Sequence, residues 1–133
     1  MAITLSAAAQ TAARNAACDA IVGLLDVGGT GTFELQTAGS VEVATLTCSA
    51  TAFGAASSGV ATANTITNDS AATGNASPVT RFEAKNGGGT VVWDGTVGES
   101  GADMNFTDAA VDGNVIIPTN SVVSLTPPTF TVN

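Results

Sequence analysis

The feature that most constrains this fold is a change of hydrophobic period near Gly31. Over about residues 6–26, apolar side chains recur at helical spacing, and Gly28 and Gly29 stop that pattern. From there to about residue 132, apolar and polar side chains alternate in short runs separated by turns rich in glycine, asparagine, serine or proline. This order predicts one N-terminal α-helix at about 6–26 followed by a β-region at about 31–132.

The clearest predicted hairpin pairs Val79–Lys85 with Thr90–Val97 across the turn Asn86–Gly89, whose residues accept positive φ. The other predicted strands are Thr32–Gln36, Glu42–Cys48, Val60–Thr67, Asp103–Thr107, Val115–Ile117, Ser121–Leu125 and Thr129–Val132. About eight short strands at such spacing are typical of an antiparallel β-sandwich or barrel, and no fixed repeat favours a solenoid. The sequence therefore predicts a mainly β protein with residues 1–133 in a single domain.

The predicted helix has one face that is mostly alanine and an opposite face that is polar. The apolar face comprises Ala9, Ala13, Ala16, Ala17, Ala20 and Leu24, whereas the polar face comprises Gln10, Thr11, Arg14, Asn15 and Asp19. In an amphipathic helix the apolar face turns to the core. We therefore expect the alanine face to pack closely on the sheet and the polar face to meet solvent.

The charge balance excludes several classes of partner. Eleven acidic residues oppose only Arg14, Arg81 and Lys85, for a net charge of −8. Binding to phosphates requires clustered cations, so nucleic acid and anionic membranes are not expected as direct partners. The longest apolar run, Ala20–Leu25, is far shorter than the ~20 residues of a membrane span, and the N-terminal stretch lacks the pattern of a signal peptide. The chain is expected to stay in the compartment where it is made.

The residues that carry most enzyme chemistry are missing. Because histidine is absent, histidine-based catalytic triads and most metal sites are excluded. Cys18 and Cys48 are interpreted as small buried hydrophobic residues, with a single bridge between them left open. The acidic stretch from Asp94 to Asp112 does not match a calcium loop, and one tryptophan without tyrosine gives little material for a glycosidase cleft. We therefore expect no enzyme, catalytic residue, cofactor or metal ligand.

Four stretches of the chain resemble a family of small virion-associated proteins of tailed bacteriophages. They are ARNAACDAIVGLLDVGGTG (Ala13–Gly31), AFGAASSGVATANTIT (Ala52–Thr67), TRFEAKNGGGTVVWDGTVG (Thr80–Gly98) and SGADMNF (Ser100–Phe106). Their motifs are turn and core patterns without catalytic residues. Some members of the family are regarded as head decoration, or cement, proteins. The resemblance implies a decoration protein that binds the major capsid protein lattice as a homotrimer and stabilises the head.

The expected location and contacts follow from that role. An acidic unit suits basic patches on the outer capsid surface of a virion, reached after synthesis in the host bacterial cytoplasm, rather than a place facing DNA. Chain ends order only when something ties them down, so both ends are predicted to supply capsid or subunit contacts. The predicted contact residues are Met1, Ala2, Ile3, Thr4, Leu5, Pro127, Pro128, Thr129 and Phe130.

Two other functions stay open. The chain resembles virion proteins in general, so a tail, neck or baseplate component is the first alternative. A carbohydrate-binding sandwich is the second, and it is less favoured because such modules present aromatic platforms to sugars. Here the single tryptophan, Trp93, falls on the predicted core face of its strand together with Val91 and Val97.

Overall fold

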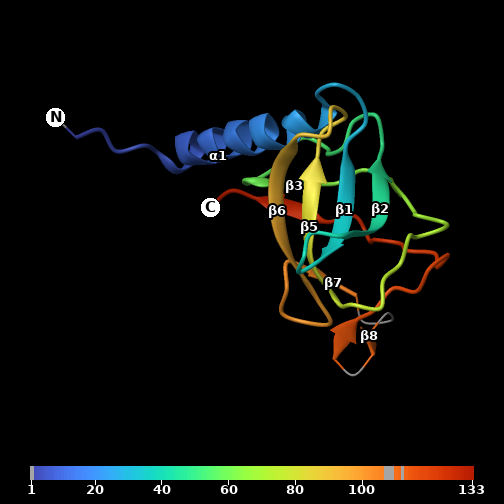
Figure 1. Ribbon diagram of the computed structural model, residues 1–133. Coiled ribbons are helices and arrows are strands. Elements are labelled where there is room, and N and C mark those ends of the chain that lie inside the picture. Colours follow the sequence, from blue (N-terminus) through green and yellow to red (C-terminus); the bar gives the residue numbers. More distant parts are fainter. Residues whose placement is uncertain (1, 107–109, 112) are drawn as a thin grey trace.

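One helix begins the chain, and strands dominate the rest, which confirms the mainly β prediction (Figure 1). The computed structural model describes residues 2–106, 110–111 and 113–133. Helix α1 spans Ala7–Val22, and its N-terminus is capped by the Ser6 hydroxyl, which accepts the Ala9 N–H at 3.2 Å. A 3-10 turn, Gly23–Asp26, continues it. The predicted helix at about 6–26 is thus present as these two pieces.

The body is a curled sheet with the strand order β4-β2-β1-β5-β6-β7. Its strands are β1 (Thr32–Thr37), β2 (Glu42–Cys48), β4 (Ile66–Thr67), β5 (Val79–Lys85), β6 (Val91–Gly98) and β7 (Met104–Asn105). The short strands β8 (Ala110–Val111) and β9 (Asn114–Val115) join it where Val115 pairs with Val79. A separate pair is formed by β3 (Val60–Thr62) and β10 (Thr129–Thr131).

The predicted hairpins are confirmed, while three details differ from the expectation. Strand β7 runs parallel to β6, so the main sheet is mixed rather than wholly antiparallel. The predicted strand Val60–Thr67 is divided into β3, which pairs with β10, and β4, which pairs with β2. Between them the Asn64 N–H donates to the Ala52 carbonyl. In place of the predicted strand Ser121–Leu125, the described residues show one isolated bridge, between Val123 and Asp69.

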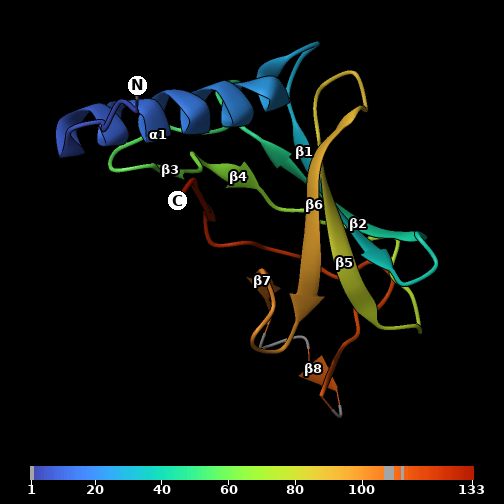
Figure 2. The ribbon, with the colours of Figure 1, turned by 90° about the vertical axis from the view of Figure 1, so that its left-hand side faces the viewer.

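The core lies between the main sheet and a second layer. Period-two alternation turns Phe33 and Leu35 of β1 and Phe82 and Ala84 of β5 to the same inner face, where all four are buried. Figure 2 shows α1, β3 and the C-terminal segment on this side of the sheet. Two layers with one shared apolar core form the arrangement expected for a sandwich.

Trp93 lies at the centre of an aromatic cluster in this core. Its ring centroid is 4.9 Å from that of Phe130, 6.0 Å from Phe53 and 6.5 Å from Phe33. These rings come from strands β6, β10 and β1 and from the loop before β3, so the cluster ties the two layers together. The expected core-side positions of Trp93 and Val97 are therefore observed, although the Trp93 side chain is only partly buried. Val91, which was expected on the same face, is exposed and lies where the β5–β6 register shifts.

The prediction for the helix faces is wrong. The alanine face is exposed at Ala13, Ala16, Ala17 and Ala20, while the residues in the core are Cys18, Val22 and, in the following turn, Leu25. Thr11, Arg14 and Asn15, which were expected in solvent, are half-buried on the packed side.

The physical reason is a set of hydrogen bonds that backbone N–H groups of a loop donate to polar side chains of α1 and of the 3-10 turn. Backbone N–H groups of the loop around residues 52–59 donate to Asn15 Oδ1 (2.7 Å), Asp19 Oδ1 (2.7 Å) and Asp26 Oδ1 (2.9 Å). Backbone donors that leave water need a partner, and these side chains supply it. These hydrogen bonds hold the polar face of the helix against the body, so the alanine face is exposed to solvent.

Candidate binding surfaces

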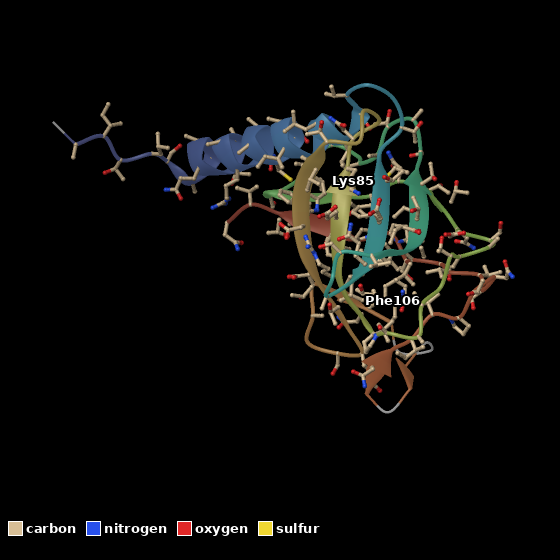
Figure 3. The ribbon with its side chains drawn as sticks, viewed as in Figure 1. Lys85 and Phe106 are labelled. Carbon is tan, nitrogen blue, oxygen red and sulfur yellow. The ribbon has the colours of Figure 1, made fainter. Side chains whose placement is uncertain are left out.

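The outer face of the main sheet carries a closed network of ion pairs. Lys85 Nζ lies 2.6 Å from Glu34 Oε2 and 3.2 Å from Glu83 Oε2, and Lys85 is labelled in Figure 3. Arg81 contacts Glu83 at 3.0 Å and Asp94 at 3.6 Å. Two of the chain's three cations are thus already neutralised, so this face offers no basic patch to a polyanion.

The electrostatics of the network confirm that its charges support one another. Partial burial opposes ionisation of Glu34, but hydrogen bonds from Lys85 and Gln36 outweigh it and hold the pKa of this carboxyl below its usual value. Desolvation of the Lys85 ammonium is likewise outweighed by its hydrogen bonds to Glu34 and Glu83, which raise the pKa of Lys85. Gln36 Nε2 also donates to both carboxylates, at 2.6 and 2.9 Å. The network therefore joins β1 and β5 across the outer face of the sheet.

The exposed face of α1 is apolar and carries no charge. It consists of Ala13, Ala16, Ala17 and Ala20 and ends at Leu24, whose exposed fraction is 49%. The two charged residues of the helix, Arg14 and Asp19, lie outside this set. Small side chains let another surface approach the helix backbone closely. The name alanine face is kept for these five residues, and Ala9, which is half-buried, is not among them.

The N-terminal segment Ala2–Leu5 projects away from the body beyond α1 (Figure 1). Every residue in it is exposed, and Ile3 is exposed to 82% and Leu5 to 51%. A hydrogen bond from Gln10 Nε2 to the Leu5 carbonyl, at 3.0 Å, joins its end to the helix. The predicted contact residues 2–5 thus lie on an open apolar arm, whereas Met1 lies outside the described residues.

The predicted contact residues at the C-terminus lie within the fold. The Pro128 carbonyl accepts the Ala63 N–H at 2.9 Å, and Thr129 and Phe130 belong to β10. Phe130 is half-buried, and its carbonyl accepts the thiol of Cys18 at 3.6 Å. Of the C-terminal contact residues, only Pro127 and Thr129 are exposed, so this end does not extend as a second arm.

A groove of about 910 Å³ opens between β7 and the segment 116–129. Its apolar lining includes Met104, Phe106, Ile117, Val123 and Leu125, and Phe106 is labelled in Figure 3. Asp103 is the charged residue of the described lining, and hydrogen bonds from the Thr96 N–H and hydroxyl hold its pKa below the usual value. The groove is therefore lined by apolar and neutral polar groups apart from one carboxylate.

Sequence reasoning did not identify this groove, because its two walls are far apart in the chain. Met104–Asn105 reaches the sheet as the parallel partner of Val97–Gly98, which no local pattern indicates. The other wall begins after Pro118 and ends at Pro127 and Pro128. Prolines at both ends of a short apolar run were the available signal for a segment that does not continue a ladder.

The two cysteines are free and buried, so the bridge that the sequence left open is absent. Burial, together with the negative charge of Asp26, raises the pKa of the Cys48 thiol to about 11. A thiol with this pKa is protonated at neutral pH and unreactive. Both residues serve as core side chains, as expected from the sequence.

Within the described ranges, no cluster of three or more histidine, cysteine, aspartate or glutamate residues is placed to hold a metal ion. Over the same residues, no helix is long and apolar enough to span a membrane. Comparison of the chain with protein-family models, curated proteins and solved structures finds no match. What the chain binds therefore has to be inferred from its own surfaces.

Proposed function

We propose that this chain is a capsid decoration protein of a tailed bacteriophage, which binds the outer surface of the major capsid lattice and stabilises the head without catalysis. The observation that carries the proposal is the alanine face of α1, which is uncharged and uncovered on a helix that projects from the body (Figure 1). The resemblance of Ala13–Gly31, which contains all five residues of this face, to phage virion proteins supports the same role.

The rest of the surface suits such a role. Ion pairs join the strands of the body, and hydrogen bonds from the loop around residues 52–59 hold α1 against it. The body therefore supports the helix in a fixed orientation. A flat face of small side chains gives close contact with another protein but little energy per residue, because each buried methyl group contributes only about 1 kcal/mol. Adequate binding then comes from many copies on a repeating lattice and from attraction between acidic and basic surfaces.

The test uses expanded shells assembled from the major capsid protein encoded nearest to the gene of this chain. Purified protein is mixed with these shells, and co-sedimentation and shell melting are measured. We expect binding to assembled shells but not to free subunits, with a rise in the shell melting temperature, because a ligand that binds only the assembled state stabilises it.

A matched pair of variants locates the contact. Ala13→Glu combined with Ala20→Glu places two charges on the alanine face and is expected to abolish shell binding while the fold is retained. Ala71→Glu combined with Ala76→Glu makes the same change at two exposed positions of the loop 68–78 and is expected to bind normally. Equal binding by both double variants would refute the alanine face as the contact.

Two outcomes would refute the decoration role itself. If the native chain neither co-sediments with shells nor changes their melting temperature, it is not a decoration protein. If it assembles alone into long tubes, the tail alternative replaces the proposal. The carbohydrate alternative gains no support, because Trp93 packs against three phenylalanine rings instead of presenting an open platform.

A further inference from the structure

The segment Ser124–Pro127 presents an unpaired backbone beside an apolar groove. In the described part of the chain, no hydrogen bond joins its N–H or C=O groups to another residue. Val123 and Leu125 alternate toward the interior while Ser124 and Thr126 are exposed, which is the pattern of an extended strand. Extended backbone with unpaired groups is a template for the addition of another strand.

The opposite wall of the groove has a similar edge. Strand β7 pairs with β6 on one side, and the described residues supply no strand on its other side. Met104 is buried at the groove and Phe106 is half-buried. An extended segment lying between the walls would therefore find apolar side chains and backbone partners together.

The same chain carries an extended segment of matching chemistry. In Ala2–Leu5, Ile3 and Leu5 are two residues apart, so in an extended conformation both side chains point to one side. Both are exposed, as are all residues of this arm. The arm is thus an exposed apolar segment, and its side chains match the apolar lining of the groove.

We propose that Ala2–Leu5 of one copy lies in this groove of a second copy, with Ile3 and Leu5 directed inward and its backbone paired to Ser124–Thr126. The arm cannot fill its own groove, because it points away from the body on one side while β7 lies at the lower end of the sheet (Figures 1 and 2). This inference concerns contacts between copies and does not rest on the proposed capsid role.

Charge favours a second copy as the occupant. Each chain has a net charge of −8, so most surfaces of two copies repel each other. The arm carries no charged side chain, and the charged residue of the described groove lining, Asp103, is bound to Thr96. The arm and groove can therefore meet without bringing acidic groups together. An exchange of this kind is head-to-tail and closes into a ring when the rotation between copies allows.

Disulfide trapping between copies tests the geometry. A chain with Thr4→Cys and a tagged chain with Thr126→Cys are mixed under mild oxidation, and the tag separates mixed dimers from the rest. Thr4 alternates with the inward Ile3 and Leu5, so in the paired arrangement its side chain lies on the same outer side as that of Thr126. Both positions are exposed, and the native thiols are buried and do not compete. We expect a mixed dimer for this pair and only background for Thr4→Cys with Thr90→Cys, an exposed residue on the β5–β6 turn. Equal yields for the two pairs would overturn the proposal.

Self-association in solution gives the second readout, by sedimentation over a range of protein concentrations. Ile3→Asp is expected to weaken association roughly 10- to 100-fold, the effect of losing one buried aliphatic side chain. Val122→Asp, in the exposed groove wall, is expected to weaken it as well, whereas Val41→Asp, an exposed apolar residue on the β1–β2 turn, leaves it unchanged. If Ile3→Asp and Val41→Asp associate alike, or the native chain stays monomeric, the arm does not occupy the groove. Neither measurement uses capsid shells, so its failure leaves the proposed function untouched.

Discussion

Adjacent residues on α1 provide the sharpest test of how the helix packs. Cys18 is fully buried and donates its thiol to the Phe130 carbonyl, while the preceding Ala17 is exposed. Replacing each residue in turn by leucine adds a large aliphatic side chain at neighbouring positions, one of which faces the core and the other solvent. The two variants should differ strongly in stability.

The structure sets the size of that difference. Cys18→Leu forces a larger side chain between α1 and β10 and loses a weak hydrogen bond, so it should lower the free energy of unfolding by about 1–3 kcal/mol. Ala17→Leu meets solvent and keeps a good helix former, so its effect should stay within about 0.5 kcal/mol. For a chain of this length, each kcal/mol corresponds to a change in Tm of roughly 3–5 °C.

Urea unfolding followed by the fluorescence of Trp93 provides the assay. This single tryptophan packs against Phe130 in the layer that α1 covers, so its emission reports the region perturbed. Linear extrapolation gives the free energy of unfolding in water for each variant. If Ala17→Leu is destabilised by more than about 1 kcal/mol while Cys18→Leu is unchanged, α1 packs through its alanine face and the helix orientation described above is wrong.

Three further perturbations test the core and the ion-pair network. Gly95→Ala should cost about 1–3 kcal/mol in urea unfolding, since its Cβ would lie 2.5 Å from a phenylalanine ring of β5. Gly23→Ala, with nothing within 4 Å of its Cβ, should be neutral or slightly stabilising in the same assay. Trp93→Ala should cost about 3 kcal/mol by urea unfolding monitored with circular dichroism, and an unchanged midpoint would place its ring outside the core. Because the folded-state pKa of Glu34 is depressed, its contribution to stability is present above pH 4.5 and is lost as the pH falls through the lower folded value. Lys85→Met removes the partner of Glu34, so it should make this dependence of stability on acid pH shallower. An identical pH profile for the variant would contradict the pairing.

The secondary structure was largely predictable because its signals are local. Turn residues such as Asn86–Gly89 and the alternation through Val79–Lys85 require no knowledge of distant parts of the chain, and the hairpin formed as expected. Elements that depend on distant partners were predicted less well. The parallel placement of Met104–Asn105 and the division of Val60–Thr67 follow from hydrogen bonds to segments elsewhere in the sequence.

The helix orientation shows why a hydrophobic pattern can mislead. The pattern assumes that polar side chains prefer water, and on that assumption Asn15 and Asp19 face outward. Here the loop around residues 52–59 brings backbone N–H groups to both side chains, which outweighs the small gain from burying alanine. A sequence cannot indicate which loop will cover a helix, so the exposed surface was assigned to the wrong side.

The sequence by itself determined the class of fold, the missing histidine chemistry and the acidic charge, because these depend on composition and on contacts between near neighbours. The tertiary structure decided which surfaces remain uncovered. The alanine face is open because polar residues hold the other side of α1, and the groove exists because Met104–Phe106 and residues 116–129 meet only after the sheet has formed. Burial depends on the partner that folding brings to each side chain, and that partner is not encoded in the local pattern.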